Sequence, residues 1–516
     1  MNRILSPFAK GRMTLKNHLV MAPMTRSRAV DNLPNELMVE YYSQRTGAGL
    51  IITEGTAPTP DALGYPRIPG IFSRAQVEGW RKVTDAVHAG GSRIFVQLMH
   101  TGRIGHYDNL PDGAQLVGAS EIKAAGQIFT DSAGLQDHSS PAALSTDGVA
   151  AVIEGHVQAA RNAVEAGFDG IELHGANGYL IEQFLNPHVN TRTDEYGGSV
   201  TARAKLAVDL AARIADAIGK EKVGIRLSPF SKLGDLQPYP EQEVHETYGY
   251  LAGELEKIGI AHIHFAVNAQ IPQKTYEVIR SSFSGTIILC NGLTPATAEA
   301  ALNAGFADLV AFGRSFLANP DLDKRIALDA HLNQPDLTTL YTPGAKGYTD
   351  YPALHPPVIV EKCEGVSLSM VGDTYRLLIR GNQTKGEFAI IDMMVPPGGG
   401  PGPHIHPLIH EVFYVQEGEV EFKTELGVHI AKAGATVYVP KGGGPHAFKN
   451  KSDRLAHLLC VVSPAGLDDF FLEVGKPVAP DTFLPPPVMD QAEVKRLGTI
   501  AAKYGMQVFP PNFLDK

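Results

Sequence analysis

Eight short apolar runs, each followed by a longer amphipathic segment, occupy the chain from residue 18 to residue 313. This alternation is typical of parallel strands joined by crossover helices, and eight such units close into a barrel. The runs lie at 18–21, 49–52, 93–96, 170–173, 223–226, 262–265, 286–289 and 308–311. We therefore predict an α/β fold, a (β/α)8 TIM barrel, for the first part of the chain.

One connection in this region is much longer than the others. Residues 104–143 are rich in Gly, Asp and Ser, and such long segments in barrels are uncommon and often functional. We expect this loop to cover the active face. By contrast, segment 149–167 places apolar residues at helical spacing and predicts a helix.

The periodicity changes after residue 343. A segment rich in Pro, Gly and Tyr follows, and beyond it runs such as 412–415, 420–423 and 435–439 alternate with period two between Gly-bearing turns. This pattern predicts an all-β domain, an antiparallel sandwich or small β-barrel. The predicted domains are a barrel at 1–345, a linker at 346–357, a β-barrel at 358–475 and a tail with a short helix at 476–516.

Composition excludes several classes of function. The 516 residues are 44% apolar and 19% charged, with a formal net charge of -10, so there is no basic surplus for nucleic acid. No uncharged run approaches the ~18 residues that span a bilayer. The three cysteines, Cys290, Cys363 and Cys460, form no CxxC pair, which argues against an iron–sulfur cluster. We expect a cytoplasmic protein without nucleic-acid or membrane partners.

Polar residues and glycines stand at the ends of the predicted strands. The carboxyl ends of barrel strands line the active face, so these residues are candidates for an active site. They include His174, Asn177 and Tyr179 directly after the fourth run. The other strand ends carry Pro23, Met24, Thr25, Gly55, Gln97, His100, Arg226, Asn291, Gly292, Gly313 and Arg314. Donors, a fixed cation and open backbone amides together suit a phosphorylated, planar, redox-active ligand.

Seven stretches in this part resemble the old yellow enzyme family of flavin-dependent ene-reductases. They are APMTRSR, GYPRIPGIF, QLMHTGR, FDGIELHGANGYLIEQFLNP, NTRTDEYGGS, FGRSFLANPDL and KGYTDYP, and the resemblance covers about residues 1–355. It implies a bound FMN that is reduced by NADPH or NADH and passes hydride to the β-carbon of an activated alkene.

The resemblance also implies a role for each matching residue. His174 and Asn177 would bind and polarise a carbonyl or nitro oxygen, and Tyr179 would protonate the α-carbon. Tyr348 would line the substrate pocket, with a packing role in the tail as the alternative. The cofactor residues would be Pro23, Met24, Thr25, Gly55, Gln97 and Arg226 around the ring, and Asn291, Gly292, Gly313 and Arg314 near the phosphate.

The sequence departs from this family at one place. Members often carry two adjacent glycines after the seventh strand, whereas this chain reads Cys290-Asn291-Gly292-Leu293. The phosphate loop can therefore sit differently, although Gly292 keeps an open amide. Related flavoproteins that reduce dienoyl thioesters carry four cysteines for an iron–sulfur cluster, and the spacing here excludes that branch.

The second half resembles the cupin superfamily over about residues 358–475. Its first motif is carried by Gly398, His404, His406, Glu411 and Gly418. Its second is carried by Gly434, Pro440, Gly442, His446 and Asn450, with one extra residue before the histidine. The whole chain is thus expected to be a TIM barrel followed by an all-β cupin domain.

Three imidazoles and a carboxylate inside a β-barrel are ligands for a divalent metal, which could be Fe, Mn, Ni, Cu or Zn. The predicted ligands are His404, His406, Glu411 and His446, with His410 as a neighbouring alternative. Another interpretation is a cupin without metal, whose histidines line a small-molecule pocket or whose surface forms a lid or a dimer contact.

Three hypotheses follow. The first is an ene-reductase for α,β-unsaturated carbonyl or nitro compounds with a metal-binding cupin fused to it. The second makes a metal-dependent, dioxygenase-like cupin reaction the main chemistry. The third treats the cupin as a non-catalytic module for ligand sensing or for assembly of a homo-oligomer.

Overall fold

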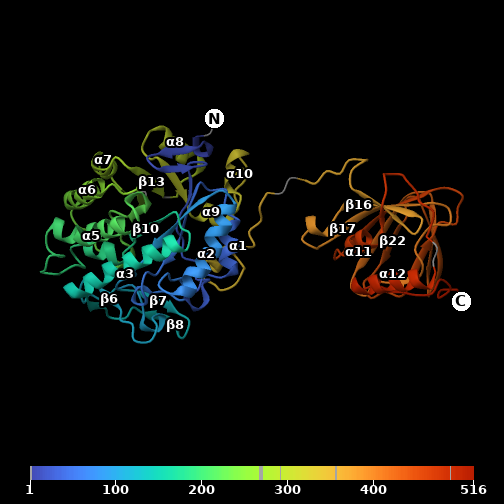
Figure 1. Ribbon diagram of the computed structural model, residues 1–516, viewed down its shortest axis with the longest axis horizontal. Helices are drawn as coiled ribbons and strands as arrows, with labels where there is room; N and C mark the ends of the chain where they lie inside the picture. Colours follow the sequence, from blue (N-terminus) through green and yellow to red (C-terminus); the bar gives the residue numbers. More distant parts are fainter. Residues whose placement is uncertain (1–2, 267–270, 291, 355–356, 488–489, 516) are drawn as a thin grey trace. The chain divides into compact units, whose positions relative to one another are not determined.

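The computed structural model describes residues 3–266, 271–290, 292–354, 357–487 and 490–515, and it divides into two compact units, Met1–Leu354 and His355–Lys516. Figure 1 shows helices around the strands of the first unit and mostly strands in the second. Each unit is described by itself. Among the described residues, no helix has both the length and the apolar character needed to cross a bilayer.

The first unit contains a closed barrel of parallel strands, which confirms the predicted TIM barrel. Its eight strands follow one another around the barrel in chain order. They are β3 (Leu19–Met21), β4 (Leu50–Thr56), β5 (Arg93–Leu98), β10 (Gly170–Gly175), β11 (Val223–Leu227), β12 (His262–Ala266), β13 (Thr286–Cys290) and β14 (Leu309–Phe312). All eight coincide with the predicted runs to within a few residues.

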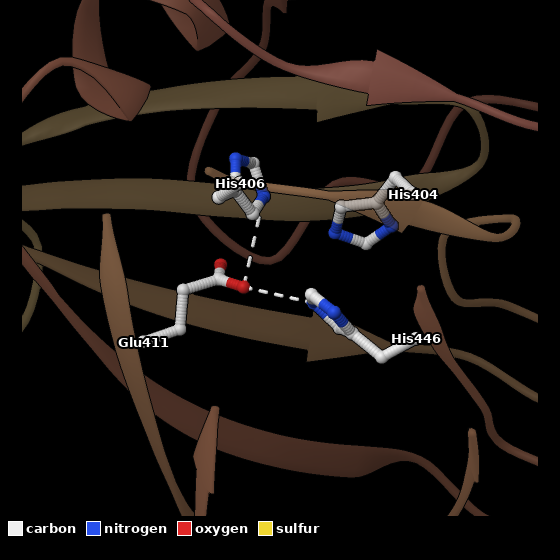
Figure 2. Close-up of side chains that lie close together, drawn as sticks. All are labelled: His404, His406, Glu411 and His446. Carbon is white, nitrogen blue, oxygen red and sulfur yellow. Dashed lines mark hydrogen bonds and ion pairs between the residues drawn. The ribbon is translucent and has the colours of Figure 1, made fainter. Parts of the chain in front are cut away.

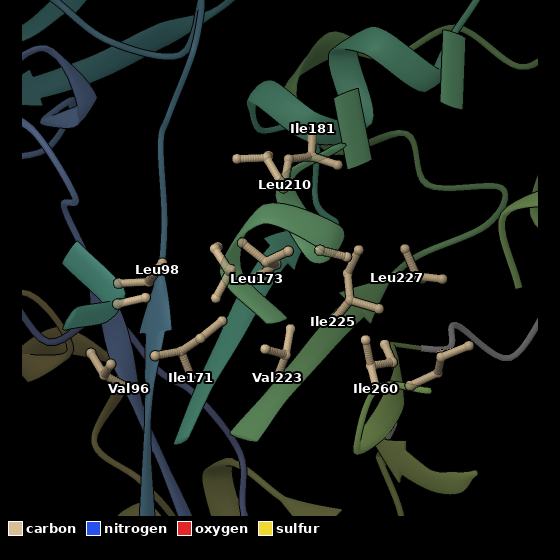
Figure 3. Close-up of a cluster of buried hydrophobic side chains, with 14 of the residues drawn as sticks. Val96, Leu98, Ile171, Leu173, Ile181, Leu210, Val223, Ile225, Leu227 and Ile260 are labelled. Atoms are coloured by element: carbon tan, nitrogen blue, oxygen red, sulfur yellow. The ribbon is translucent and has the colours of Figure 1, made fainter. Parts of the chain in front are cut away.

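Helices form the outer layer because each carries an apolar face toward the strands. In Figure 3, Ile171 and Leu173 of β10 and Val223 and Ile225 of β11 belong to the cluster that joins strands and helices. The helices are α1 (Glu36–Ser43), α2 (Arg74–Ala89), α3 (Thr146–Glu165), α4 (Leu180–Leu185), α5 (Val200–Ile218), α6 (Glu241–Ile258), α7 (Gln273–Ser282), α8 (Pro295–Asn303), α9 (Arg314–Ala318) and α10 (Leu322–Ala327). Each fully buried Leu or Ile side chain contributes about 1.5–3 kcal/mol relative to exposure.

The barrel interior is apolar at one end. Alternate residues such as Val20 and Ala22, or Leu309 and Ala311, form a second cluster with Phe8 and Leu15. Phe8 and Leu15 belong to the antiparallel pair β1 (Phe8–Lys10) and β2 (Met13–Leu15). Because side chains alternate along a strand, the intervening residues face the helices.

The long loop after β5 carries short strands of its own. β6 (Val117–Gly118) pairs with β9 (Ala142–Ala143), and β7 (Gln127–Thr130) forms a hairpin with β8 (Gly134–Asp137). Segment 346–354, predicted as linker, belongs instead to the first unit. The reason is packing, since Tyr348 is fully buried there.

The second unit is all-β, with antiparallel pairing in two sheets, as predicted. One sheet has the order β22-β19-β24-β17-β16-β15-β25 and the other β21-β20-β23-β18-β26. The first comprises β15 (Val366–Met370), β16 (Asp373–Ile379), β17 (Ala389–Val395), β19 (His410–Glu417), β22 (Thr436–Val439), β24 (Ala456–Ser463) and β25 (Lys476–Pro477). The second comprises β18 (His404–Ile405), β20 (Glu419–Thr424), β21 (Gly427–Lys432), β23 (His446–Lys449) and β26 (Gln507–Val508).

The segment predicted as a tail is more integrated than expected. It contains α12 (Gln491–Lys503), and it supplies β25 to one sheet and β26 to the other. Another helix, α11 (Leu467–Val474), packs Phe471 against Tyr375 of β16. The tail is therefore part of the second unit rather than an appendage.

Candidate functional sites

A cavity of about 950 Å³ opens at the carboxyl ends of the barrel strands. It is lined from strand ends, from residues 125–138 of the long loop and from residues 337–343. Seven of the predicted site residues line it: Pro23, Thr25, Gln97, His174, Asn177, Tyr179 and Arg226. The volume is that of a site for a cofactor or drug-sized ligand.

His174 is held as a neutral hydrogen-bond donor. It lies at the end of β10, and its Nδ1 accepts the backbone N–H of Ala176 at 3.3 Å. In a neutral imidazole the other nitrogen then carries the proton, so Nε2–H is the donor that remains. Burial, and then the nearby charge of Arg226, lower the pKa of His174 to about 3. The side chain is therefore uncharged at neutral pH.

The turn after β10 presents Asn177 to the cavity. Asn177 has a left-handed backbone with φ of 59°, and its N–H donates to Ser228 Oγ at 2.8 Å. The next residue, Gly178, has φ of 83°, and a Cβ there would lie 2.3 Å from the carbonyl oxygen of Leu233. Only glycine fits this position without strain. The turn geometry thus fixes the placement of the amide side chain.

Tyr179 precedes α4 and stands beside His174. The two rings are perpendicular, with 4.7 Å between centroids. The Tyr179 hydroxyl donates to the hydroxyl of Tyr65 at 3.1 Å. Burial raises the pKa of Tyr179 well above its ordinary value, so the phenol keeps its proton at neutral pH. A proton donor and a hydrogen-bond donor therefore face the same cavity.

Arg226 provides a cation at the cavity wall. It pairs in register with His174 on the neighbouring strand, and its Nη2 lies 3.7 Å from Cys290 Sγ. Among the described residues nothing accepts a hydrogen bond from its buried Nε. A buried guanidinium with an unpaired N–H is suited to an electron-rich ring or an anion.

The remaining predicted cofactor residues do not line this cavity. The backbone of Gly55 lies close to Met99: a Cβ added at Gly55 would be 2.4 Å from Met99 Sδ. A Cβ added at Gly313 would be 3.4 Å from Met24 Sδ. Gly292 follows β13, while Gly313 and Arg314 follow the adjacent strand β14. Asn291 lies outside the described residues.

These features fit FMN. A cation, an amide and a threonine line a cavity of suitable size, and Gly292 and Gly313 follow the neighbouring strands β13 and β14 of the same barrel. Gly292 has φ of 49°, and a Cβ there would meet nothing within 4 Å, so a phosphate could approach its backbone. The donor set matches a planar ring with a phosphate tail.

The prediction for Tyr348 is wrong. Its side chain is 0% exposed and is absent from the cavity wall; it stacks on Tyr41 with 4.0 Å between centroids. The packing alternative holds because the guanidinium groups of Arg26 and Arg28 also cover the Tyr348 ring. The ring is thereby enclosed in the first unit's core.

Tyr341 lines the cavity instead, and sequence reasoning missed it. Its segment is held by the two arginines: Arg28 donates to the carbonyl oxygens of Thr339, Leu340 and Lys346, and Arg26 to that of Gly347. The sequence did offer one sign of this role, because Tyr341 is a second tyrosine in the segment that contains Tyr348. Five residues of 337–343 reach the cavity wall.

The second unit brings together all four predicted metal ligands. One potential ligand atom from each of His404, His406, Glu411 and His446 lies within 4.8 Å of the other three. Figure 2 shows the four side chains pointing toward one another. His404 and His446 come from β18 and β23 of one sheet, and Glu411 from β19 of the other. The site therefore lies between the two sheets. The extra residue before His446 does not displace it.

The histidines present Nε2 to this centre. His404 Nδ1 lies 2.8 Å from the carbonyl oxygen of Gly402, and His446 Nδ1 lies 3.4 Å from that of Gly444, so both Nδ1–H groups donate outward. Glu411 Oε2 lies 3.0 Å from His446 Nε2 and 3.6 Å from His406 Nε2. Burial lowers the pKa of His404 to about 4, which leaves a neutral imidazole at pH 7. Neutral imidazoles and a carboxylate fit a divalent metal.

His410 does not belong to this cluster. Its Nδ1 lies 2.8 Å from the hydroxyl of Tyr438, with which its ring is stacked. Because alternate residues of a strand face opposite sides, His410 points away from Glu411.

Comparisons with known proteins agree with both halves of this description. Residues 3–333 match the family described as NADH:flavin oxidoreductase / NADH oxidase, and residues 391–462 match a cupin domain. The chain is 40% identical over 364 residues to 12-oxophytodienoate reductase 1 of Oryza sativa subsp. japonica, which covers 68% of this chain and 93% of the relative.

Solved structures give the same result for the barrel. Morphinone reductase shares 44% identity with a TM-score of 0.65, over 69% of this chain and 97% of that protein. An old yellow enzyme homologue from Zymomonas mobilis shares 40% identity with a TM-score of 0.65, over 68% and 99%. Morphinone reductase has also been solved in complex with tetrahydroNAD.

Proposed function

Because this chain belongs to the NADH:flavin oxidoreductase / NADH oxidase family, the old yellow enzyme family, we propose that it reduces alkenes conjugated to a carbonyl or nitro group. The observation that carries the proposal is the meeting of His174, Asn177 and Tyr179 at one cavity beside Arg226. Bound FMN would accept hydride from NADPH or NADH and deliver it to the β-carbon.

His174 and Asn177 bind the substrate's oxygen. The Nε2–H of neutral His174 and the amide N–H of Asn177 donate to the carbonyl or nitro oxygen, where negative charge develops as hydride arrives. A neutral imidazole stabilises this charge as a donor and does not give up its proton to the enolate. Tyr179 then donates its phenolic proton to the α-carbon and recovers one from solvent.

The cofactor is held by residues of the chain in three places. Gln97, Thr25 and Arg226, which line the cavity, would contact the ring, and Arg226 would place positive charge where the reduced flavin is anionic. Gly292, Gly313 and Arg314 would bind the phosphate from the ends of β13 and β14. Pro23, Met24 and Gly55 would pack against the ring.

The substrate class follows from the acceptor that these donors fit. Relatives are named as reductases of 12-oxophytodienoate and of morphinone, which supports a carbonyl compound. Purified protein with a folded barrel should show a flavin band near ~450 nm. An alkene panel with NADPH and with NADH then defines substrate and reductant. Absence of the flavin band from folded protein would overturn the proposal.

We also propose that the cupin domain binds a divalent metal through His404, His406, Glu411 and His446. The support is the convergence of three Nε2 atoms and a carboxylate in a buried place. Metal analysis of the purified chain should find about one ion per chain. Glu411→Ala should reduce that content strongly, whereas His410→Ala should not.

A metal-dependent cupin reaction is the second candidate. Open coordination positions at this centre would permit oxygen activation. Removing the metal with a chelator distinguishes the two: alkene reduction survives if the barrel is the principal enzyme, and any cupin-dependent activity is lost.

A role in assembly is the third candidate, and one observation favours it. The hairpin of β20 and β21 exposes Leu426, Val428 and Ile430, with Leu426 95% exposed. Exposed apolar residues grouped in this way are typical of protein contacts. A chain ending at Leu354 with unchanged oligomeric state and kinetics would exclude this role.

A further inference from the structure

A polar layer lies inside the barrel next to the cavity, in contrast to the apolar interior at the other end. It centres on Glu172 of β10, which is fully buried and which the chemistry proposed above does not use. Glu172 Oε1 accepts from Gln97 Nε2 at 2.8 Å. Its Oε2 lies 3.0 Å from His262 Nε2 and 2.8 Å from His264 Nδ1.

This contact determines how the Gln97 amide is turned. Glu172 is an acceptor when ionised, so the amide must direct an N–H toward it. The Gln97 side chain also lines the cavity, and no described residue donates to its Oε1. The carbonyl oxygen is therefore the group offered to a ligand. Without Glu172 the amide could rotate and offer N–H instead.

Glu172 remains ionised in this position. Burial opposes its charge, but His264 and His262 outweigh that effect and hold the pKa of Glu172 below its ordinary value. The pKa of His264 is raised by the same carboxylate. A buried carboxylate is costly unless it is paired and hydrogen-bonded, and here it has three partners.

The surrounding chain leaves room for this arrangement. A Cβ at Gly224 of β11 would lie 2.0 Å from the His262 ring, so glycine is needed for that imidazole to reach Glu172. A layer that served packing alone would be filled by branched apolar side chains, as in most barrels. The layer is thus built around the carboxylate.

We propose that Glu172 is a positioning residue for the cofactor: it fixes the Gln97 amide so that Oε1 accepts the hydrogen bond of the flavin N3–H. This inference rests on the proposed function, because it requires FMN in this cavity. N3–H is the one N–H that the pyrimidine edge of an oxidised flavin presents, so an oxygen facing it is complementary and an N–H is not.

The test uses the full chain reconstituted with ¹⁵N-enriched FMN. In the wild-type protein the N3–H proton should appear downfield and be protected from exchange with water. In Glu172→Gln it should move upfield and broaden, and the Kd for FMN should rise about tenfold, the effect of one lost buried hydrogen bond. Glu172→Asp keeps the charge but withdraws the carboxylate from Gln97, and it should give the same spectral change.

Two control variants separate positioning from general stability. His262→Phe removes one partner of Glu172 but leaves the contact with Gln97, and Asp321→Asn neutralises another buried carboxylate, which pairs with Arg325. Both should keep the N3–H resonance in place. Gln97→Leu should lose it, and adding Glu172→Gln to that variant should have no further effect on Kd.

The outcomes are distinct. If either folded Glu172 variant keeps the wild-type N3–H resonance, the positioning role is wrong, and the same holds if His262→Phe shifts it equally. If the wild-type protein binds no FMN, the proposed function itself fails.

Discussion

The imidazole of His174 and the phenol of Tyr179 meet edge to face, at 87° and 4.7 Å between ring centroids. The first is a neutral imidazole and the second a phenol that keeps its proton, so two groups for which we propose different tasks lie side by side at the cavity. This separation makes their contributions measurable one at a time.

Tyr179→Phe should affect one half-reaction only. Loss of the phenolic proton should slow alkene reduction by about 10²-fold or more, while flavin reduction by the nicotinamide stays nearly unchanged. Stopped-flow measurement of the two half-reactions checks this. Tyr65→Phe is the control, because it removes the neighbour of the Tyr179 hydroxyl and leaves the acid in place. Equal loss in both half-reactions would contradict the role.

Removing either substrate donor should weaken stabilisation of the enolate. His174→Ala and Asn177→Ala should each reduce the rate of alkene reduction by about 10²-fold. Because burial lowers the pKa of His174 to about 3, the residue stays neutral from pH 5 to pH 9. Its contribution should therefore show no titration in this range. A step near pH 6.5 in the rate of alkene reduction that disappears in His174→Ala would contradict the conclusion that His174 acts as a neutral donor.

Two tyrosines of the same segment should behave differently. Tyr348→Ala should lower the free energy of unfolding by about 3 kcal/mol, because it empties a buried position. Tyr341 is 62% exposed, so Tyr341→Ala should change stability by only about 0.5 kcal/mol or less and raise KM for the alkene. Denaturant titration measures the free energy of unfolding of each variant, and steady-state kinetics measure its KM. If instead Tyr348→Ala raised KM and left stability unchanged, Tyr348 would line the substrate pocket as first predicted.

Glu182 should make the first unit less stable as the pH rises. It accepts from Gly178 N–H, Ser228 Oγ and Tyr248 Oη, but burial raises its pKa from 4.5 to about 7. The folded state therefore holds this proton more tightly than the unfolded chain. The resulting stability is fully present below about pH 4.5 and is lost as the pH rises through 7.

Glu182→Gln should remove this dependence. Relative to the variant, the wild-type protein should lose about 2.5 kcal/mol of unfolding free energy between pH 5 and pH 8. Fluorescence of Trp80, the single tryptophan of the chain and fully buried in the first unit, reports unfolding there. If the free energy of unfolding depends on pH in the same way in both proteins, protonation of Glu182 is not linked to folding.

Metal removal should affect the second unit alone. An ion that binds only the folded state stabilises it, and more so the further its free concentration exceeds the Kd, so chelation should lower the melting temperature of the cupin transition in calorimetry. The midpoint of unfolding of the first unit, followed by Trp80 fluorescence, should not change on chelation. His404→Ala should reproduce the low transition without chelator, and a chelator should not shift it further.

The barrel strands could be predicted because buried parallel strands are nearly continuous apolar runs. The His/Glu cluster could be predicted because its four residues stand in the order of the two cupin motifs, with one extra residue before His446. The choice between Tyr341 and Tyr348 could not, since it depends on Arg26 and Arg28, more than 300 residues earlier in the chain. Strand β26 has two residues and carries no periodic signal of its own.

The polar layer also escaped sequence reasoning, although a sign was present. Glu172 interrupts an apolar run, and two histidines alternate in β12. Charged residues in the middle of barrel strands indicate an interior network, but their partners come from strands that are distant in sequence.

The arginine clamp on residues 339–347 determines where modules can be exchanged. A graft that joins another domain at residue 345 would delete Tyr348 and cut the chain between residues that Arg26 and Arg28 hold. It should disturb the cavity through Tyr341, even though His174, Asn177 and Tyr179 are kept. Chimeras of this enzyme should instead be joined beyond Leu354, where the first compact unit ends.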